Sequence, residues 1–231
     1  GTEPTKDRLR VLAEMAKKDP LLLQAPGHPM SALVSLPKTW KPGKEYPLLV
    51  TLEGEQIVFD ANLNHFRDER GAREWIVVCP HTLTSAVEVK FDRYPAYPEA
   101  LVREWNFKRL EFDDAGLLPL LDFLHTHFGA SSRFALAGHS TGATMALRTL
   151  LMHPDRVARA VFTGPKADPE APSGAGTAKG GGPPVLILLG SRDTARVAEA
   201  DAVTSAMKEH GVTQVERRAV LRDSMLQTVL D

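Results

Sequence analysis

Short runs of almost wholly apolar residues alternate with helical patterns along this chain, and this alternation restricts the folds open to it. Such runs occur at 47–52, 75–79, 134–137 and 185–189. Strands with so few polar residues are found in parallel sheets, where helices cover both faces. We therefore expect an α/β fold with a mainly parallel central sheet and helices on both faces.

Weaker patterns complete this alternation. We expect further strands at 32–36, 160–163 and 215–221, and helices at 5–18, 62–73, 117–128, 141–152 and 195–210. In the helix at 117–128 we expect Pro119 in the first turn or at a kink, because proline lacks a backbone N–H. Loops or turns are expected at 25–30 and 41–44, where proline and glycine gather.

The chain's 231 residues fit one domain, and we expect a single domain over 1–231 with three less regular parts. An N-terminal helix and loop occupy 1–30, and a flexible loop rich in glycine and proline occupies 165–184. Residues 82–110 form an insertion without a clear period that is rich in aromatic side chains. It either forms the wall of a site or packs over the edge of the sheet, and the sequence leaves both interpretations open.

Composition excludes several classes of function. Lys and Arg number 28 and Asp and Glu 29, so no net field draws the chain to nucleic acid or to an anionic membrane. No apolar stretch reaches the ~18 residues of a membrane span, and we expect a soluble protein. No Cys/His cluster has zinc spacing, and we predict neither a metal nor a cofactor. A secreted or periplasmic location is favoured over the cytoplasm, while the compartment and the oligomeric state stay open.

The strongest local signal is the run Gly138-His139-Ser140-Thr141-Gly142. It matches the G-x-S-x-G pattern and lies between an expected strand and an expected helix. A serine in such a turn needs flanking residues without side chains, because the strand and the helix come very close there. The turn lifts the serine hydroxyl over the carboxyl edge of the sheet, and the first helical N–H groups point to the same place. We therefore predict Ser140 as a nucleophile; the alternative is a glycine-rich turn with an idle serine.

With this motif in place, the chain resembles the α/β-hydrolase fold from about 32 to 230. Residues 46–54 resemble the strand that precedes the family's oxyanion loop, and 113–128, 133–142 and 153–157 resemble bacterial esterases. The narrower likeness is to small bacterial carboxylesterases of the feruloyl-esterase and polyester-depolymerase type. The resemblance implies a serine-type hydrolase of carboxylic esters that needs no cofactor. Its substrate would be a small or polymeric ester, with polyesters and aryl esters among the candidates.

The resemblance also implies an acid and a histidine that follow the serine in the chain. Asp193 follows the expected strand at 185–189 and matches the family's acid, which orients the imidazole; the alternative is that it caps the next helix. After the last expected strand, Asp223 stands where the family has histidine, and no histidine follows His210. Either a natural or deliberate change has removed the histidine, or another residue acts as the base. A carboxylate is a weak base at neutral pH, so we expect weak activity.

The resemblance implies that the backbone N–H groups of Thr141 and Glu55 form the oxyanion hole. The family commonly has His-Gly after the preceding strand, whereas this chain has Glu53 and a glycine. Acidic side chains beside an oxyanion oppose its formation. Two histidines are candidates for lining the site: His81, which follows an expected strand at the carboxyl edge, and His139, which is next to the serine. For His139 a structural role is favoured, because adjacent residues in the turn point apart.

Two functions therefore remain. The first is a serine-type ester hydrolase with the residues named above, from which an amidase or thioesterase cannot be told apart by sequence. The second is a non-catalytic relative of the α/β hydrolases that binds a ligand or a protein partner in the former cleft. The ester hydrolase is the leading hypothesis, and the missing histidine and Glu53 are the features that favour its rival. Asp223→His separates the two, because a strong gain of ester cleavage would indicate a disabled enzyme.

Overall fold

The computed structural model describes residues 11–12, 14–15, 17–54, 58–69, 74–85, 94, 97–165, 177–190 and 194–220. Within these residues, an eight-stranded sheet has the order β1-β2-β4-β3-β5-β6-β7-β8. The strands are β1 (Leu21–Gln24), β2 (Ser31–Ser35), β3 (Tyr46–Leu52), β4 (Ile76–Pro80), β5 (Ala130–His139), β6 (Val157–Thr163), β7 (Val185–Gly190) and β8 (Val215–Val220). β2 is antiparallel to β1 and β4, and the other neighbouring strands are parallel.

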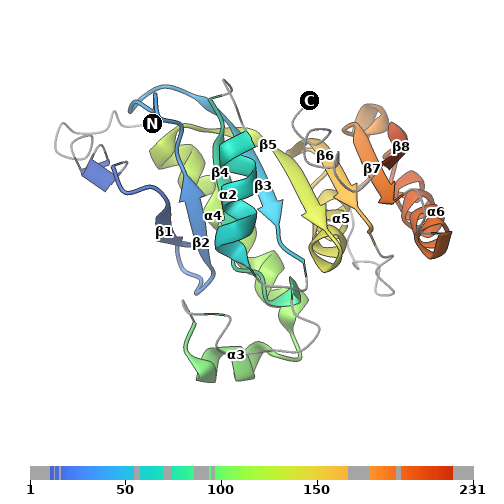
Figure 1. Ribbon diagram of the computed structural model, residues 1–231, viewed down its shortest axis with the longest axis horizontal. Coiled ribbons are helices and arrows are strands. Elements are labelled where there is room, and N and C mark those ends of the chain that lie inside the picture. The colour runs from blue at the N-terminus through green and yellow to red at the C-terminus, as the bar shows by residue number, and fades with distance from the viewer. Residues whose placement is uncertain are drawn as a thin grey trace.

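Helices lie against both faces of this sheet. They are α2 (Phe59–Glu69), α3 (Glu99–Trp105), α4 (Arg109–Phe128), α5 (Thr141–Met152) and α6 (Thr194–Glu209), with short 3-10 helices η1 (Leu83–Ser85) and η3 (Lys179–Gly181). α2 packs on β4 and β2, whereas α4 and α5 pack on β5. Figure 1 shows α2 in front of the sheet and α4 behind it. The predicted α/β fold with a mainly parallel sheet is confirmed. Among the described helices, none is both long enough and apolar enough to cross a membrane.

The central strands are apolar on both faces. In β3, Val50 and Leu52 are at most 1% exposed, and Leu49 on the opposite face is only 5% exposed. Val50 pairs with Val78 of β4 on one side and with Leu136 of β5 on the other. Complete burial of one such side chain contributes roughly 1.5–3 kcal/mol. The apolar runs of the sequence therefore become the middle of the sheet, as expected for strands covered on both faces.

The structure differs from the sequence interpretation near β1 and α4. β1 was missed, because four alternately buried and exposed residues are too short a pattern to separate from a loop. α3 and the start of α4 fall inside 82–110, where no period was found, and α4 begins at Arg109 instead of 117. Pro119 lies in the middle of α4, not in its first turn. The carbonyl that loses its N–H partner belongs to Ala115, which is exposed to water.

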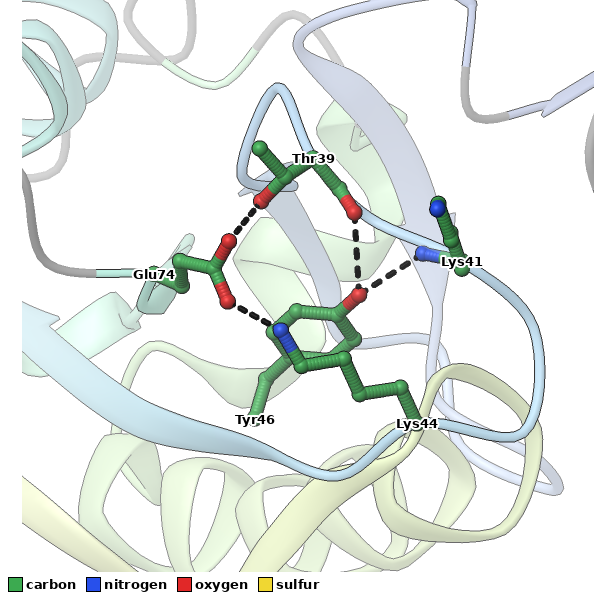
Figure 2. A network of polar contacts seen from close by, with 5 residues as sticks. All are labelled: Thr39, Lys41, Lys44, Tyr46 and Glu74. Atoms are coloured by element: carbon green, nitrogen blue, oxygen red, sulfur yellow. Dashed lines mark hydrogen bonds and ion pairs between the residues drawn. The ribbon is translucent and has the colours of Figure 1, made fainter.

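A network of polar contacts lies at the amino edge of the parallel strands, where β3 and β4 begin (Figure 2). Glu74 accepts hydrogen bonds from Thr39 Oγ1 and Lys44 Nζ. Tyr46 donates its hydroxyl proton to the carbonyl of Thr39 and accepts the N–H of Lys41 at 2.7 Å. The hydrogen bond from Lys44 lowers the pKa of Glu74, and both side chains are exposed. These contacts tie the turn before β3 to the start of β4.

Candidate active site

Ser140 occupies a strained turn between β5 and α5. β5 ends at His139, and α5 begins at Thr141. The backbone of Ser140 has φ 53° and ψ −120°, and Ser140 is the one described residue other than glycine with a positive φ. Its N–H donates to the carbonyl of Thr163 in β6 at 2.9 Å, which holds the turn against the sheet. Strain of this kind persists where the surrounding structure enforces it, most often at functional sites.

Both glycines of the motif are required by close packing. A Cβ at Gly138 would lie 2.7 Å from the Cα of Ala143 in α5. A Cβ at Gly142 would overlap the carbonyl oxygens of Leu52 and Glu53 at the end of β3. β3, β5 and α5 thus converge on the turn at distances that only glycine allows. The sequence prediction that a side chain at either position would clash agrees with this geometry.

The loop that follows β3 runs beside the serine. A Cβ at Gly54 would lie 3.4 Å from the Cβ of Ser140 and 3.1 Å from the carbonyl oxygen of His139. Glu53 precedes this glycine and is only 9% exposed. Desolvation raises the pKa of the Glu53 carboxyl to about 7, although a hydrogen bond from the N–H of Gly54 acts in the opposite direction. Near neutral pH, the carboxyl of Glu53 is therefore partly protonated.

Three predicted site residues lie outside the described residues: Glu55, Asp193 and Asp223. The strands that precede them are in place, because β3, β7 and β8 run parallel to β5 and end at the same carboxyl edge. Among the described residues, no histidine ring is hydrogen-bonded to Ser140. Thr141 is the first residue of α5, where helical geometry gives an N–H no partner within the helix. That this N–H belongs to an oxyanion hole stays a prediction.

His81 and His139 lie in different environments at this edge. His81 follows β4 and is 4% exposed, with its Nδ1 3.0 Å from Ser31 Oγ. Its ring packs on Phe59 with the centroids 4.5 Å apart, and burial lowers its pKa to about 4, so the imidazole is neutral at physiological pH. His139 is exposed, and its ring lies against Gly54. That either histidine lines the site stays a prediction.

A buried carboxyl that the sequence interpretation did not single out lies in α4. Asp113 is 0% exposed and accepts the N–H groups of Leu83 and Thr84 in η1 at 2.8 and 3.0 Å. Burial raises its pKa to about 7. The sequence carried one signal for it. Asp113 lies four residues before the buried Leu117, on a helix face that otherwise holds apolar residues.

The described residues form no metal site, and a hollow that they line lies away from Ser140. Among the described residues, no group of three or more His, Cys, Asp or Glu side chains could hold a metal ion. A hollow of about 500 Å³ is lined by residues at the amino ends of β6, β7 and β8, among them Arg159, Val185 and Glu216. Because the serine lies at the carboxyl edge, this hollow is not adjacent to it.

A family model described as "Putative esterase" matches residues 24–217, which is most of the chain. The chain belongs to this esterase family. The membership agrees with the turn at Ser140 and with the glycine-bearing loop beside it, and the resemblance to α/β-hydrolase esterases is confirmed. No curated protein matches this esterase-family chain.

Several solved structures share the fold of this esterase-family chain. A thermostable esterase has 15% identity over 90% of the chain with a TM-score of 0.56, and the chain spans 56% of that structure. Poly(aspartic acid) hydrolase-1 from Sphingomonas sp. KT-1 has 17% identity, a TM-score of 0.64, and coverage of 92% of this chain and 97% of that one. Thermogutta terrifontis esterase 2, in a form phosphonylated by cyclosarin, has 13% identity, a TM-score of 0.60, and coverage of 91% and 90%. At such identities, the likeness shows the α/β-hydrolase fold.

Proposed function

We propose that this esterase-family protein hydrolyses carboxylic esters through an acyl-enzyme on Ser140. The observation that carries the proposal is the strained backbone of Ser140, with φ 53°, at the start of α5. A side chain in that conformation is costly, by about 1–3 kcal/mol, and a catalytic hydroxyl that must stand clear of the sheet is a physical reason to keep it. The close approach of Gly54 adds support, because the oxyanion loop of such enzymes must adjoin the nucleophile.

In the proposed reaction, Ser140 Oγ attacks the carbonyl carbon of the ester, and its proton passes to a base. The carbonyl oxygen becomes an oxyanion, held by the N–H groups of Thr141 and Glu55. Collapse of this intermediate breaks the ester C–O bond, and the alcohol leaves with the proton from the base. Water then hydrolyses the acyl-enzyme by the same steps. α5 assists, because the positive end of its dipole points to the oxyanion.

The base is the weak part of this machinery. We assign Asp223 to the position of the base and Asp193 to the acid that would orient an imidazole. A carboxylate with an ordinary pKa near ~4 takes the serine proton poorly at neutral pH. Removal of a triad member typically costs about 10⁴-fold or more in kcat, and binding and the oxyanion hole supply what remains. We therefore propose slow turnover for the chain as it stands.

The substrate class is proposed by analogy with the structural neighbours. One of them is named for hydrolysis of poly(aspartic acid), and another is an esterase that cyclosarin phosphonylates. We propose small or polymeric esters as substrates, including aryl esters and polyesters. Phosphonylation of the second neighbour suggests that fluorophosphonates are suitable probes for Ser140 in this chain.

The experiment measures hydrolysis of 4-nitrophenyl acetate by wild type, Ser140→Ala and Asp223→His. Ser140→Ala should fall to the background of the buffer, and Asp223→His should raise kcat/KM by about 100-fold or more because an imidazole is a far better base near pH 7. Unchanged hydrolysis by Ser140→Ala would contradict the proposal. Asp223→Asn is the matched control, since it alters the same position without adding a base.

A second function is favoured by a specific observation, the buried acidic residue Glu53 directly after β3, whose backbone carbonyl approaches Gly142. An acidic group there opposes an oxyanion, and together with Asp223 it suits a non-catalytic relative that binds a ligand or a protein partner in the cleft. The same assay separates the two functions. If Asp223→His folds and gains no ester cleavage, the binding function is preferred.

A further inference from the structure

Side chains from distant parts of the chain hold the backbone of residues 81–84, which leave β4 at the carboxyl edge. The hydroxyl of Tyr97 donates to the carbonyl of His81 at 2.7 Å, and that of Tyr94 donates to the carbonyl of Thr82 at 3.1 Å. Asp113 accepts the next two backbone N–H groups, at 2.8 and 3.0 Å. Side chains thus hydrogen-bond to the backbone of four consecutive residues.

Asp113 is the unusual member of this group. It is 0% exposed inside α4, and besides the two N–H groups it accepts the hydroxyl of Thr84 at 2.5 Å. Burial of a carboxyl is costly unless it is hydrogen-bonded, and an apolar residue would suit this helix face better. The raised pKa of Asp113 reflects that cost. The three hydrogen bonds to η1 are therefore a physical reason for an acid at this place.

The fixed segment adjoins the helix of the proposed nucleophile. η1 packs against both α4 and α5, and Leu83 within it is 0% exposed. α5 begins at Thr141, directly after Ser140, at the same carboxyl edge at which β4 ends. η1 thus connects the buried carboxyl of α4 to the side of the site where Ser140 lies.

We propose that Asp113 is a positioning residue of the hydrolase site: through Leu83 and Thr84 it fixes η1 against α5 and so holds the wall beside Ser140. This rests on the proposed function, in which Ser140 is the nucleophile. Asp113 touches no reacting atom. Its loss should let η1 move, misplace the wall and slow reaction at Ser140 more than it lowers the stability of the fold.

The neighbouring Asp114 supplies a control within the same helix. Its Oδ2 lies 2.7 Å from Nε of Arg148 in α5, so this ion pair joins α4 directly to α5. Asp114→Asn should therefore lower the melting temperature yet leave reaction at Ser140 within about twofold of wild type. A general loosening of α4 against α5 would instead slow the reaction in both variants.

The test measures the rate of Ser140 phosphonylation by a fluorophosphonate, separated into the maximal rate and the half-saturating concentration, alongside the melting temperature. We expect Asp113→Asn to slow labelling by about tenfold, equivalent to about 1.4 kcal/mol in the activation free energy. Thr84→Val, which has the same shape without the hydroxyl, should slow it by about threefold. Thr84→Ser, which keeps the hydroxyl, should label within twofold of wild type.

The outcomes separate this inference from the proposed function. If wild type does not label at Ser140, the proposed function fails and the positioning role fails with it. If wild type labels, and folded Thr84→Val and Asp113→Asn label at the wild-type rate, only the positioning role is overturned. If Asp113→Asn does not fold, the Thr84→Val and Thr84→Ser pair decides. Slower labelling in the valine variant alone supports the role, and equal labelling in both overturns it.

Discussion

The two edges of the central sheet carry polar side chains in opposite states. At the amino edge, Glu74 and Lys44 pair in the open, and their hydrogen bond lowers the pKa of the acid (Figure 2). At the carboxyl edge, Glu53 and Asp113 are buried, and desolvation raises the pKa of each to about 7. The comparison teaches that burial, not residue type, sets the chemistry of a carboxyl group. The candidate site lies at the carboxyl edge, where the carboxyl groups are buried.

Two glycines also differ between the amino edge and the carboxyl edge of the sheet. Gly43, in the turn at the amino edge, has φ +82° and nothing within 4 Å of an added Cβ. Gly142, at the carboxyl edge, has helical backbone angles, but an added Cβ would strike the carbonyls that end β3. Gly43 is required by the backbone conformation of a local turn, whereas Gly142 is required by the close packing of β3, β5 and α5.

The largest predicted effect tests the difference between Gly142 and Gly43. Gly142→Ala should cost at least about 3 kcal/mol in the free energy of unfolding or prevent folding, because backbone atoms cannot move aside cheaply. Gly43→Ala should cost only about 1 kcal/mol, the penalty of a left-handed conformation in open space. Urea denaturation of both variants measures the difference. Equal losses would show that the turn at Ser140 is not as closely packed as described.

The next effect tests the burial of Glu53 through its pH dependence. With a folded-state pKa of about 7 against about 4.5 in the unfolded chain, the folded state binds more protons between these values, so stability falls as pH rises through that window. The loss amounts to at most about 3 kcal/mol. Glu53→Gln carries no such charge and should gain stability relative to wild type by that amount between pH 4.5 and 7. A constant difference across this range would contradict the raised pKa.

The smallest effect belongs to the amino edge. Glu74→Gln removes the charge that pairs with Lys44, but water screens this exposed pair and already solvates both groups. We expect the melting temperature to change by less than about 2 °C and the ester-cleavage rate to stay the same. A larger drop would mean that the network in Figure 2 stabilises the sheet more than exposed ion pairs usually do.

The sequence was informative where local pattern and packing agree. The helix 141–152 has the predicted bounds, because a glycine-flanked serine begins it and Pro154 follows its end. The start of α4 was placed eight residues late, because the prediction followed the strongly apolar run at 117–128, whereas the helix also includes the more polar residues from Arg109.

The candidate site was predictable only in part. Ser140 and the approach of the loop after β3 follow from the motif and the strand order, whereas Asp113 does not. Its partners Leu83 and Thr84 are about thirty residues away in sequence, and a contact of that kind leaves no periodic signal. The raised pKa of Glu53 also depends on burial that arises only in the folded chain. The roles of Asp193 and Asp223, which lie outside the described residues, stay predictions.

The central claim is that the strained turn presents Ser140 as a nucleophile. Incubation of the wild-type chain with a fluorophosphonate, followed by peptide mass spectrometry, tests it most directly. One phosphonyl group per chain is expected, on Ser140; Ser140→Ala should lack it, and Asp223→His should acquire it faster. An unmodified Ser140 in folded wild type, or an adduct on another residue, would contradict it.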